Sequence, residues 1–358
     1  DVNEKIFLGL NKDIKTAHMD AIRINNAFWP LLNIIGAVGN ALIFIVGAGM
    51  VTRGEVTVGT LVAFTSYMGR FWMPLSTMSN FYNQLLIAMA SAERVFEILD
   101  TKPEVTDKPG AVPMPPIKGH VEFDHVYFHY EPDKPVLKDV SFVVQPGENI
   151  ALVGPTGAGK STIINLIARF YDVTGGRVLI DGFDVRDVTL ESLRSQLGIV
   201  LQDTFLFSGT IMDNIRYGKL DATDEEVIAA AKAVHADDFI REFKNGYFTE
   251  VRERGSRLSV GQRQLISFAR ALLADPRILI LDEATSSIDT HTERLVQMGI
   301  ERLLEGRTSF VIAHRLSTIR NADRIMVVDD GQIKESGTHE ELMAAGGIYR
   351  DLYTSQFS

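Results

Sequence analysis

The feature that most constrains the fold of this chain is a glycine-rich segment between a strand-like run and a helix-like run. Residues 154–161 read Gly-Pro-Thr-Gly-Ala-Gly-Lys-Ser and match the pattern G-x-x-x-x-G-K-[ST]. Residues 149–153 form a short apolar run of strand type, and residues 162–168 are apolar at helical spacing. A strand, a glycine loop and a helix in this order are typical of an α/β domain that binds phosphate, and this context argues against a chance glycine turn.

Each residue type in this loop has a physical role in binding phosphate. Glycines let backbone N–H groups approach phosphate oxygens without an intervening Cβ, and the helix N-terminus adds partial positive charge. We expect Lys160 to reach the β- and γ-phosphates of a nucleoside triphosphate and Ser161 to ligate Mg²⁺. The predicted nucleotide-binding residues of the segment are Gly154, Thr156, Gly157, Gly159, Lys160, Ser161 and Thr162.

A second segment places two acids at the end of an apolar run. Residues 278–281 are apolar, and Asp282 and Glu283 follow directly. Such a run suits a central parallel strand that is covered on both faces, and open α/β sheets bind ligands at the carboxyl ends of their strands. We expect Asp282 to hold Mg²⁺, directly or through water, and Glu283 to orient and deprotonate the attacking water. For either acid alone, capping of the next helix is the alternative.

A third segment indicates the family. Residues 258–264 read Leu-Ser-Val-Gly-Gln-Arg-Gln and precede an alanine- and leucine-rich helix. The segment resembles the signature of ATP-binding cassette (ABC) proteins, whose usual form is Leu-Ser-Gly-Gly-Gln. Further segments are similar to other cassette motifs, and together they cover essentially the whole chain. They are Tyr130 (adenine-stacking aromatic), Gln202 (glutamine loop), residues 249–255 (an exporter-type loop, with Arg252 where glycine is usual), residues 286–289 (the loop after the catalytic acid) and His314 (switch histidine).

The resemblance implies a role for each of these residues. Gln202 is expected to ligate Mg²⁺ and water and to sense the membrane domain, and His314 to contact the γ-phosphate; with Glu283 they form the predicted catalytic group. Tyr130 is expected to stack on adenine, a contact worth about 1–3 kcal/mol by analogy with nucleic-acid platforms. Without the resemblance, Tyr130 could equally be an ordinary aromatic residue at a strand end, and His314 a hydrogen-bonded structural histidine. Further nucleotide contacts are implied for Ser259, Gly261, Gln262 and Asp289.

Val260 departs from the family pattern, because glycine is usual at this position. Valine is β-branched and disfavours a positive φ. A left-handed conformation at this position would impair the signature, whereas an ordinary helical N-terminal conformation would tolerate valine. Since Ser259 and Gly261 are both kept, we expect a working signature.

The N-terminal part of the chain has the composition of membrane helices. No charged residue lies between Arg23 and Arg53, and about 20 apolar residues span a bilayer as a helix. We predict a membrane helix over about 24–51, with a buried core helix of a soluble protein as the alternative. A second segment, 58–89, is amphipathic and contains Arg70. It spans a membrane only if its polar side faces protein or water; the alternative is a helix on the membrane surface.

The predicted fold is an α-helical transmembrane hairpin followed by an α/β P-loop NTPase domain with an antiparallel β-subdomain and a helical signature subdomain. The domains are expected at 1–100 (partial transmembrane domain), 101–118 (linker) and 119–358 (nucleotide-binding domain). The linker contains Pro103, Pro109, Pro113, Pro115 and Pro116, a composition that favours an extended, semi-rigid segment.

Composition excludes several classes of function. The chain has 358 residues and no cysteine, which excludes disulfides and cysteine-based metal sites. Its net charge is −10, and no run of Lys and Arg gives the electrostatic footprint of a duplex-binding protein. Nucleic acid is therefore not an expected partner. Because the chain starts at Asp1 without a signal peptide, we expect it to be the C-terminal part of a longer protein.

The resemblance implies half of an ABC exporter of the bacterial multidrug or lipid type, with ATP and Mg²⁺ as cofactors. It implies an integral protein of the bacterial cytoplasmic membrane with a cytoplasmic nucleotide-binding domain. ATP is then bound between the phosphate loop of one cassette and the signature of another, so the expected partners are a second half-transporter, identical or different, membrane lipid and a transported substrate. Two alternatives are a soluble cassette ATPase and a non-hydrolysing nucleotide-gated regulator. The charge-free segment argues against the first, and Glu283 and His314 argue against the second.

Overall fold

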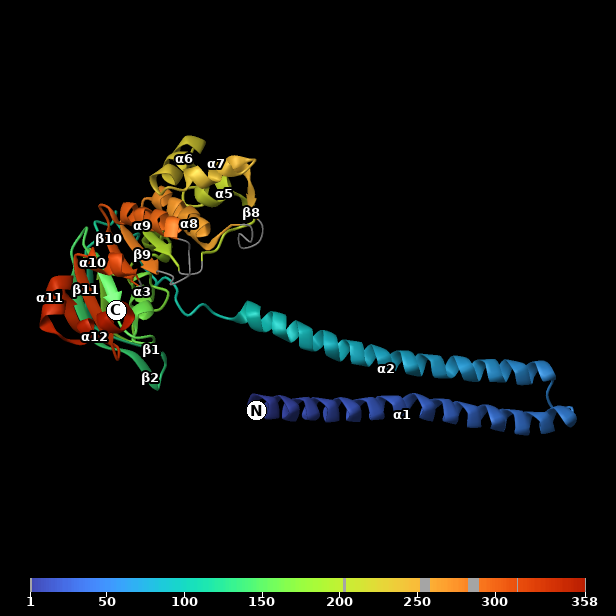
Figure 1. Ribbon diagram of the computed structural model, residues 1–358. Coiled ribbons are helices and arrows are strands. Elements are labelled where there is room, and N and C mark those ends of the chain that lie inside the picture. Colours follow the sequence, from blue (N-terminus) through green and yellow to red (C-terminus); the bar gives the residue numbers. More distant parts are fainter. Residues whose placement is uncertain (1, 202–203, 252–257, 283–289, 314, 358) are drawn as a thin grey trace. The chain divides into compact units, whose positions relative to one another are not determined.

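The computed structural model describes the whole chain except residues 1, 202–203, 252–257, 283–289, 314 and 358 (Figure 1). It divides into two compact units, residues 1–102 and 103–358. The predicted fold class is confirmed, since a helical hairpin precedes an α/β domain with a separate antiparallel sheet.

The first unit is a hairpin of two long helices, α1 (Val2–Thr52) and α2 (Val58–Asp100). Gly54 has a φ of 74° in the turn between them, and the Thr57 hydroxyl caps α2 by accepting from the Thr60 N–H at 3.2 Å. The helices approach closely where α1 carries small residues: a Cβ added to Gly39 would lie 2.8 Å from Met68 Cε. The hairpin is therefore packed through the small residues of α1.

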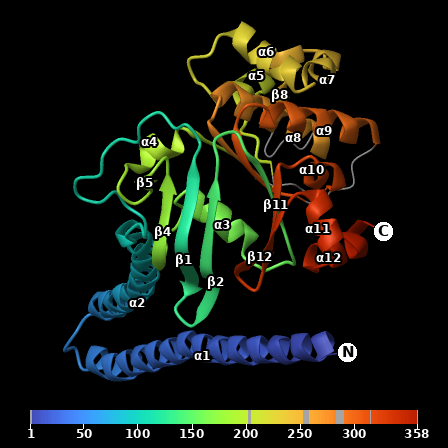
Figure 2. The same ribbon diagram turned by 90° about the vertical axis from the view of Figure 1, so that its left-hand side faces the viewer.

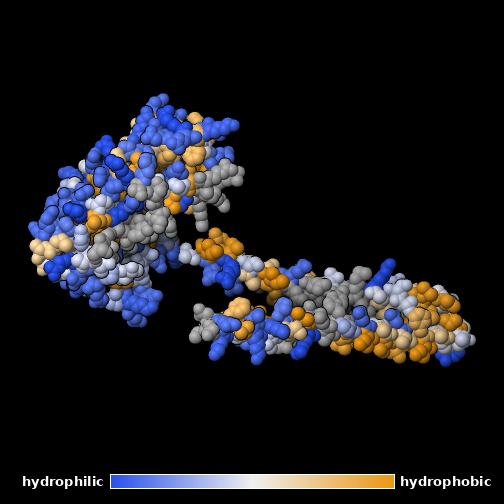
Figure 3. Space-filling view, viewed as in Figure 1, coloured by the Kyte–Doolittle hydropathy of each residue, from blue (hydrophilic) through white to orange (hydrophobic). Residues whose placement is uncertain are grey.

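The two helices differ in how well they suit a bilayer. Within the described residues, one helix segment, Asn33–Thr52, is long and apolar enough to cross a membrane. The helix α2 forms over the second predicted segment but does not meet the same criterion. Large apolar side chains such as Phe44, Ile45 and Val46 are exposed on α1, and Figure 3 shows such side chains gathered towards the turn end of the hairpin. A surface of this kind suits lipid or neighbouring membrane helices.

The second unit is built on two main sheets (Figure 2). The antiparallel sheet has the strand order β2-β1-β4-β5. The six-stranded sheet has the order β12-β11-β3-β10-β9-β6 and is parallel except for its edge strand β12. The strands are β1 (Val121–Glu131), β2 (Lys134–Val144), β3 (Asn149–Val153), β4 (Gly175–Ile180), β5 (Phe183–Asp184), β6 (Leu197–Val200), β9 (Ile278–Asp282), β10 (Thr308–Ile312), β11 (Arg324–Asp329) and β12 (Gln332–Gly337), with β7 (Gly209–Thr210) paired to β8 (Glu250–Val251).

Helices cover the six-stranded sheet and build a separate helical part. They are α3 (Lys160–Ile167), α4 (Leu190–Arg194), α5 (Ile211–Arg216), α6 (Asp224–Ala233), α7 (Asp237–Glu242), η1 (Gly246–Phe248), α8 (Val260–Ala274), α9 (Thr290–Leu304), α10 (Leu316–Arg320), α11 (His339–Ala345) and α12 (Ile348–Phe357). The helices α5, α6 and α7 lie beyond α8 in both ribbon views (Figures 1 and 2). This arrangement confirms the predicted helical subdomain.

The strand β9 shows why its sequence is a continuous apolar run. Leu279 and Leu281 pack into the core shared with the helical part, whereas Ile278 and Ile280 pack into the core on the other face. All four are buried. Alternate residues of a strand point to opposite faces, so a strand covered on both faces must be apolar throughout. This burial fixes the position of the acid that ends the strand, Asp282.

Candidate functional site

The phosphate loop joins β3 to α3 and requires glycine at two positions. Gly154 has a φ of 146°, and an added Cβ would overlap the Val328 carbonyl oxygen on the neighbouring strand β11. Gly159 has a φ of 110° at the N-cap of α3, where an added Cβ would lie 2.7 Å from Leu137 Cδ2. Residues that carry a side chain rarely adopt these φ values. The glycines of the motif are thus needed for the shape of the loop itself.

The Lys160 side chain folds back over this loop. Its Nζ donates to the Gly154 carbonyl oxygen at 2.7 Å and to the Pro155 carbonyl oxygen at 2.9 Å. Burial lowers the pKa of the Lys160 amine, and the negative charge of Asp282 opposes that shift. A partly buried cation at a helix start is well placed to attract phosphate. Ser161, the next residue, is exposed.

Asp282 lies at the same edge of the sheet as the phosphate loop. In the strand β10, Ile312 pairs with Asp282 on one side and with Leu152 on the other. The strands β9 and β3 are therefore two strand spacings apart, about 10 Å. Asp282 is half-buried, and its negative charge raises the pKa of Lys160 against the lowering by burial. The structure thus brings the carboxylate and the amine to one edge of the sheet, as open α/β sheets do for ligand sites.

Several predicted site residues lie outside the described part of the chain. They are Gln202, Glu283, Asp289 and His314, together with Arg252 of the exporter-type loop. Their roles stay predictions.

Tyr130 lies against the start of α3. Its hydroxyl is 3.3 Å from Thr162 Oγ1 and accepts from Asn165 Nδ2 at 3.4 Å. The ring packs edge-on against Phe128 and Tyr171, with centroids 4.8 and 5.0 Å away. Tyr130 is still 48% exposed. These contacts fix the Tyr130 side chain beside the phosphate-loop helix and leave about half of it exposed, which suits the predicted role of stacking on adenine.

The signature segment begins the helix α8. Ser259 is the N-cap: its Oγ accepts from the Gln262 N–H at 3.2 Å, and Gln262 Oε1 accepts from the Ser259 N–H at 3.0 Å. This reciprocal pair is a capping box. Val260 is the first helical residue and is 38% exposed. Valine thus occupies an ordinary helical position, where no positive φ is required, and Gly261 is buried behind it.

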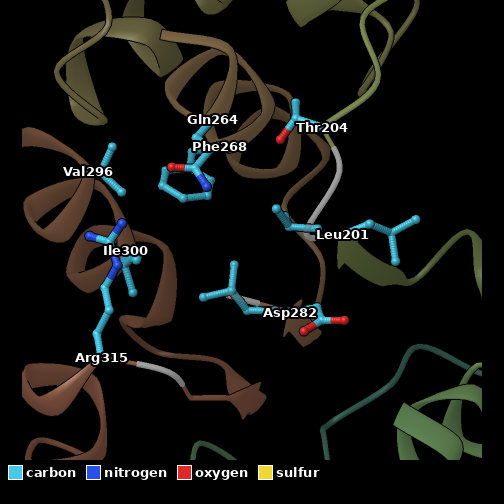
Figure 4. Close-up of a pocket in the computed structure, with 10 residues that line it drawn as sticks. Leu201, Thr204, Gln264, Phe268, Asp282, Val296, Ile300 and Arg315 are labelled. Carbon is cyan, nitrogen blue, oxygen red and sulfur yellow. The ribbon is translucent and has the colours of Figure 1, made fainter. Parts of the chain in front are cut away.

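A small polar cavity lies between the helices α8 and α9 and the ends of β6 and β9 (Figure 4). Gln264 of α8 is only 7% exposed, and neither its Oε1 nor Thr204 Oγ1 has a hydrogen-bond partner within the described part of the chain. The cavity is lined by Val200, Leu201, Thr204, Gln264, Phe268, Leu281, Asp282, Val296, Ile300 and Arg315. A polar wall with unsatisfied acceptors suits a bound water.

Sequence reasoning missed this cavity, although Gln264 carried a signal. It shares the buried face of α8 with Phe268 and Ala271, which lie four and seven residues further on. A polar residue within an apolar helical stripe indicates a buried polar contact.

A cluster of exposed aromatic side chains was also missed. Phe205, Phe207 and Tyr217 have neighbouring ring centroids 5.1 and 4.6 Å apart. The Arg270 guanidinium lies over two of these rings, at 5.6 Å from Phe207 and 5.7 Å from Tyr217. All three aromatic residues are exposed. Grouped aromatics on a surface are typical of a protein contact.

Comparison with known families supports what the geometry indicates. Residues 137–286 match the family model described as ABC transporter, and residues 3–75 match the ABC transporter transmembrane region. The chain belongs to the ABC transporter family. The resemblance found in its motifs is therefore confirmed, and family membership implies a membrane protein whose cassette binds ATP.

Individual ABC transporters match along almost all of this chain. The ABC transporter ATP-binding protein YknV of Bacillus subtilis is 52% identical over 356 residues, 99% of this chain and 59% of that protein. A fatty acid ABC transporter ATP-binding/permease protein of Mycobacterium bovis is 49% identical over 346 residues, 97% of this chain and 54% of that protein. The chain thus spans somewhat more than half the length of these relatives.

A solved structure is also similar to this ABC transporter chain. It is that of a bacterial Atm1-family ABC exporter with ATP bound, with a TM-score of 0.71 and 41% identity. The match covers 91% of this chain and 56% of the other.

Proposed function

We propose that this chain is the C-terminal part of a half-transporter that exports a substrate across a membrane and is driven by ATP hydrolysis. The observation that carries the proposal is that Lys160 and Asp282 lie at the same edge of the sheet. The same chain also contains a helical hairpin with an exposed apolar surface. A phosphate site alone fits many enzymes. The hairpin and the two matched ABC modules point to transport.

ATP fits the phosphate loop through groups that are already in place. Lys160 now donates to two main-chain carbonyl oxygens, and charged phosphate oxygens are stronger acceptors for an ammonium group. Tyr130 offers its half-exposed ring beside the start of α3. The remaining contacts of the loop, from Gly154, Thr156, Gly157, Gly159 and Thr162, belong to the same proposal.

The side chains near the loop also suit Mg²⁺, which prefers oxygen ligands. Ser161 offers an exposed hydroxyl and Asp282 a half-buried carboxylate, with the Gln202 amide oxygen as the third proposed ligand. When bound, the ion neutralises charge on the phosphates. In this proposal Glu283 takes a proton from the attacking water, Gln202 also contacts that water, and His314 contacts the γ-phosphate.

We infer that the signature acts on nucleotide held by a second cassette. The Ser259 Oγ accepts from the Gln262 N–H, which leaves its own O–H proton free to donate to a phosphate. Gly261, Gln262 and Asp289 complete the proposed contacts. A complete site then needs a second half-transporter, identical to this chain or different. Closure of the pair is a population shift set by the differential affinity of ATP for the closed state.

We propose that the exposed cluster of Phe205, Phe207 and Tyr217 is a surface through which the cassette contacts another protein segment. We place the protein in the bacterial cytoplasmic membrane with its cassette in the cytoplasm and its hairpin in contact with lipid. The long apolar face of α1 supports this location.

The test is the full-length assembly carrying Glu283→Gln. Loss of the general base should reduce ATP turnover by about 10²–10⁴-fold, whereas ATP binding should be kept because the loop and Lys160 are unchanged. Near-normal turnover would show that Glu283 does not activate the water.

A further inference from the structure

Arg169 is a fully buried cation that the nucleotide site does not use. It follows the helix α3 by two residues and has 0% exposure. Its Nε donates to Asp172 Oδ1 at 2.9 Å, its Nη1 to the Val188 carbonyl oxygen at 3.0 Å, and its Nη2 to the Thr106 carbonyl oxygen at 3.0 Å. A buried charge is strongly destabilising unless it is paired and hydrogen-bonded. Each of these contacts is therefore needed, including the one to the linker.

The linker is docked on the second unit from Thr106 onward. Asp107 Oδ1 accepts from the Leu190 N–H at 2.8 Å. Val112 exchanges backbone hydrogen bonds with Asp187 and Thr189 at 3.1 and 3.0 Å. This pairing places the linker beside the segment that contains Val188, a second partner of Arg169. The linker is thus held along the residues that directly follow the guanidinium contact.

Further side chains bind the linker backbone down to β1. Ser192 Oγ accepts from the Met114 N–H at 2.7 Å, and Gln196 Oε1 from the Ile117 N–H at 2.8 Å. Asp181 accepts from the N–H groups of residues 118–120 at 2.6 to 3.2 Å. The prolines of the linker have no N–H and restrict the chain before it docks. The segment therefore lies on the second unit as an ordered strap.

The strap meets the same short helix that holds the phosphate loop. Lys160 begins α3 at the loop, and the eight residues of α3 span about 12 Å. At its other end, Arg194 donates to the carbonyl oxygens of Ala168 and Arg169 at 3.2 and 2.6 Å. Cations at a helix C-terminus are favourable. One rigid helix thus joins the phosphate loop to the strap.

The strap is also joined to α2 by a short stretch of chain. The helix α2 ends at Asp100, and Thr106 is the residue whose carbonyl Arg169 binds. The intervening residues, 101–105, span at most about 18 Å when fully extended. The end of α2 cannot move further than this tether allows without pulling on the base of α3.

We propose that Arg169 is a positioning residue that locks the strap to α3, so that movement of the cassette when the pair closes on ATP is transmitted to α2. The inference rests on the proposed ATP-driven function and adds a route of coupling through the linker. Arg169 touches neither the loop nor Asp282 in its hydrogen bonds. Its loss therefore uncouples the two units and leaves nucleotide affinity unchanged.

The experiment uses the full-length assembly in nanodiscs with an environment-sensitive fluorophore on a cysteine introduced at Ser91 of α2. Arg169→Lys keeps the charge but loses the fork that reaches three acceptors. Asp107→Ala removes both the Leu190 contact and the 3.9 Å ion pair with Arg169 Nη1 from a partly exposed position, and it guards against misfolding. Lys108→Ala is the matched control, because it breaks only the exposed pair of Lys108 with Asp187 in the same segment.

In both test variants we expect ATP affinity within about twofold of the parent, linker amides that exchange hydrogen roughly tenfold faster, and an ATP-induced fluorescence change reduced by at least about half. Lys108→Ala should match the parent in all three. A full fluorescence response despite faster hydrogen exchange in the linker would overturn the proposal. A loss of ATP affinity as large as the loss of the fluorescence response would also overturn it, because Arg169 would then act on nucleotide binding. A parent assembly that binds no ATP would instead refute the proposed function.

Discussion

The N-cap of α8 allows the structural role of Ser259 to be separated from its proposed role in catalysis. Ser259→Ala removes one of the two hydrogen bonds of the capping box. Loss of an N-cap serine costs about 1 kcal/mol, within a range of about 0.5–2 kcal/mol. For a domain of this size, that corresponds to a fall of about 2–4 °C in Tm.

Ser259→Asp is the decisive substitution. Aspartate caps a helix about as well as serine, and its charge is favourable at a helix N-terminus, so the Tm should stay at the parent value. The same charge would face the phosphates of the partner's nucleotide. Loss of a donor to developing charge costs about 10²–10³-fold in turnover, and the added repulsion should make the loss at least as large. Ser259→Thr keeps both the cap and the hydroxyl and is the matched control.

The assays are thermal unfolding without nucleotide and ATP turnover by the full-length assembly. The expected pattern is a lower Tm for Ser259→Ala, and an unchanged Tm with turnover almost abolished for Ser259→Asp. Near-parental turnover by the aspartate variant would refute the view that this residue faces phosphate. A Tm for the aspartate variant as low as that of the alanine variant would refute the capping argument.

Three further predictions concern single residues of the cassette. Val260→Gly should lower the free energy of unfolding in urea by no more than about 0.5 kcal/mol and leave ATP turnover near the parent value, because valine begins a helix there without strain; a larger loss of stability or a several-fold rise in ATP turnover would contradict this. Lys160→Ala should weaken Mg·ATP binding measured by calorimetry, and in the parent the affinity should fall as pH rises through the lowered pKa of Lys160, since only the protonated amine attracts phosphate; unchanged affinity in the alanine variant, or no such fall in the parent, would contradict the role. Gln264→Leu removes a buried acceptor of the small polar cavity and should lower the free energy of unfolding in urea by about 1–3 kcal/mol, because the water that this cavity suits loses a hydrogen-bond partner; an unchanged or higher free energy of unfolding would show that Gln264 Oε1 binds no ordered water.

Local patterns in the sequence were enough to predict the phosphate loop and the strand before Asp282. Both depend on short-range chemistry: glycines at forced backbone angles in one case, and an apolar run buried on both faces in the other. The helical conformation at Val260 could also be predicted from the sequence. Ser259 and Gln262 have the spacing of a capping box, which places the next residue, Val260, inside a helix.

Long-range contacts were not predictable in the same way. The proline content of residues 101–118 indicated an extended segment, but docking depends on acceptors that lie 61 to 79 residues further along the chain. The cavity at Gln264 similarly depends on how α8 and α9 meet the ends of β6 and β9. Composition fixes what a segment can do, whereas its partners are fixed only by the fold.

The measurement that most directly tests a nucleotide site shared between two chains is complementation in an assembly of two copies. Lys160→Ala and Ser259→Asp, each in the full-length chain, should both be inactive alone. In a mixed assembly, the phosphate loop of the Ser259→Asp copy and the signature of the Lys160→Ala copy form one intact site. We predict that ATP turnover returns in mixed assemblies isolated through two different tags. If each site were built within one chain, every site would carry one substitution, and turnover that stays absent in the isolated mixed assembly would contradict the shared site.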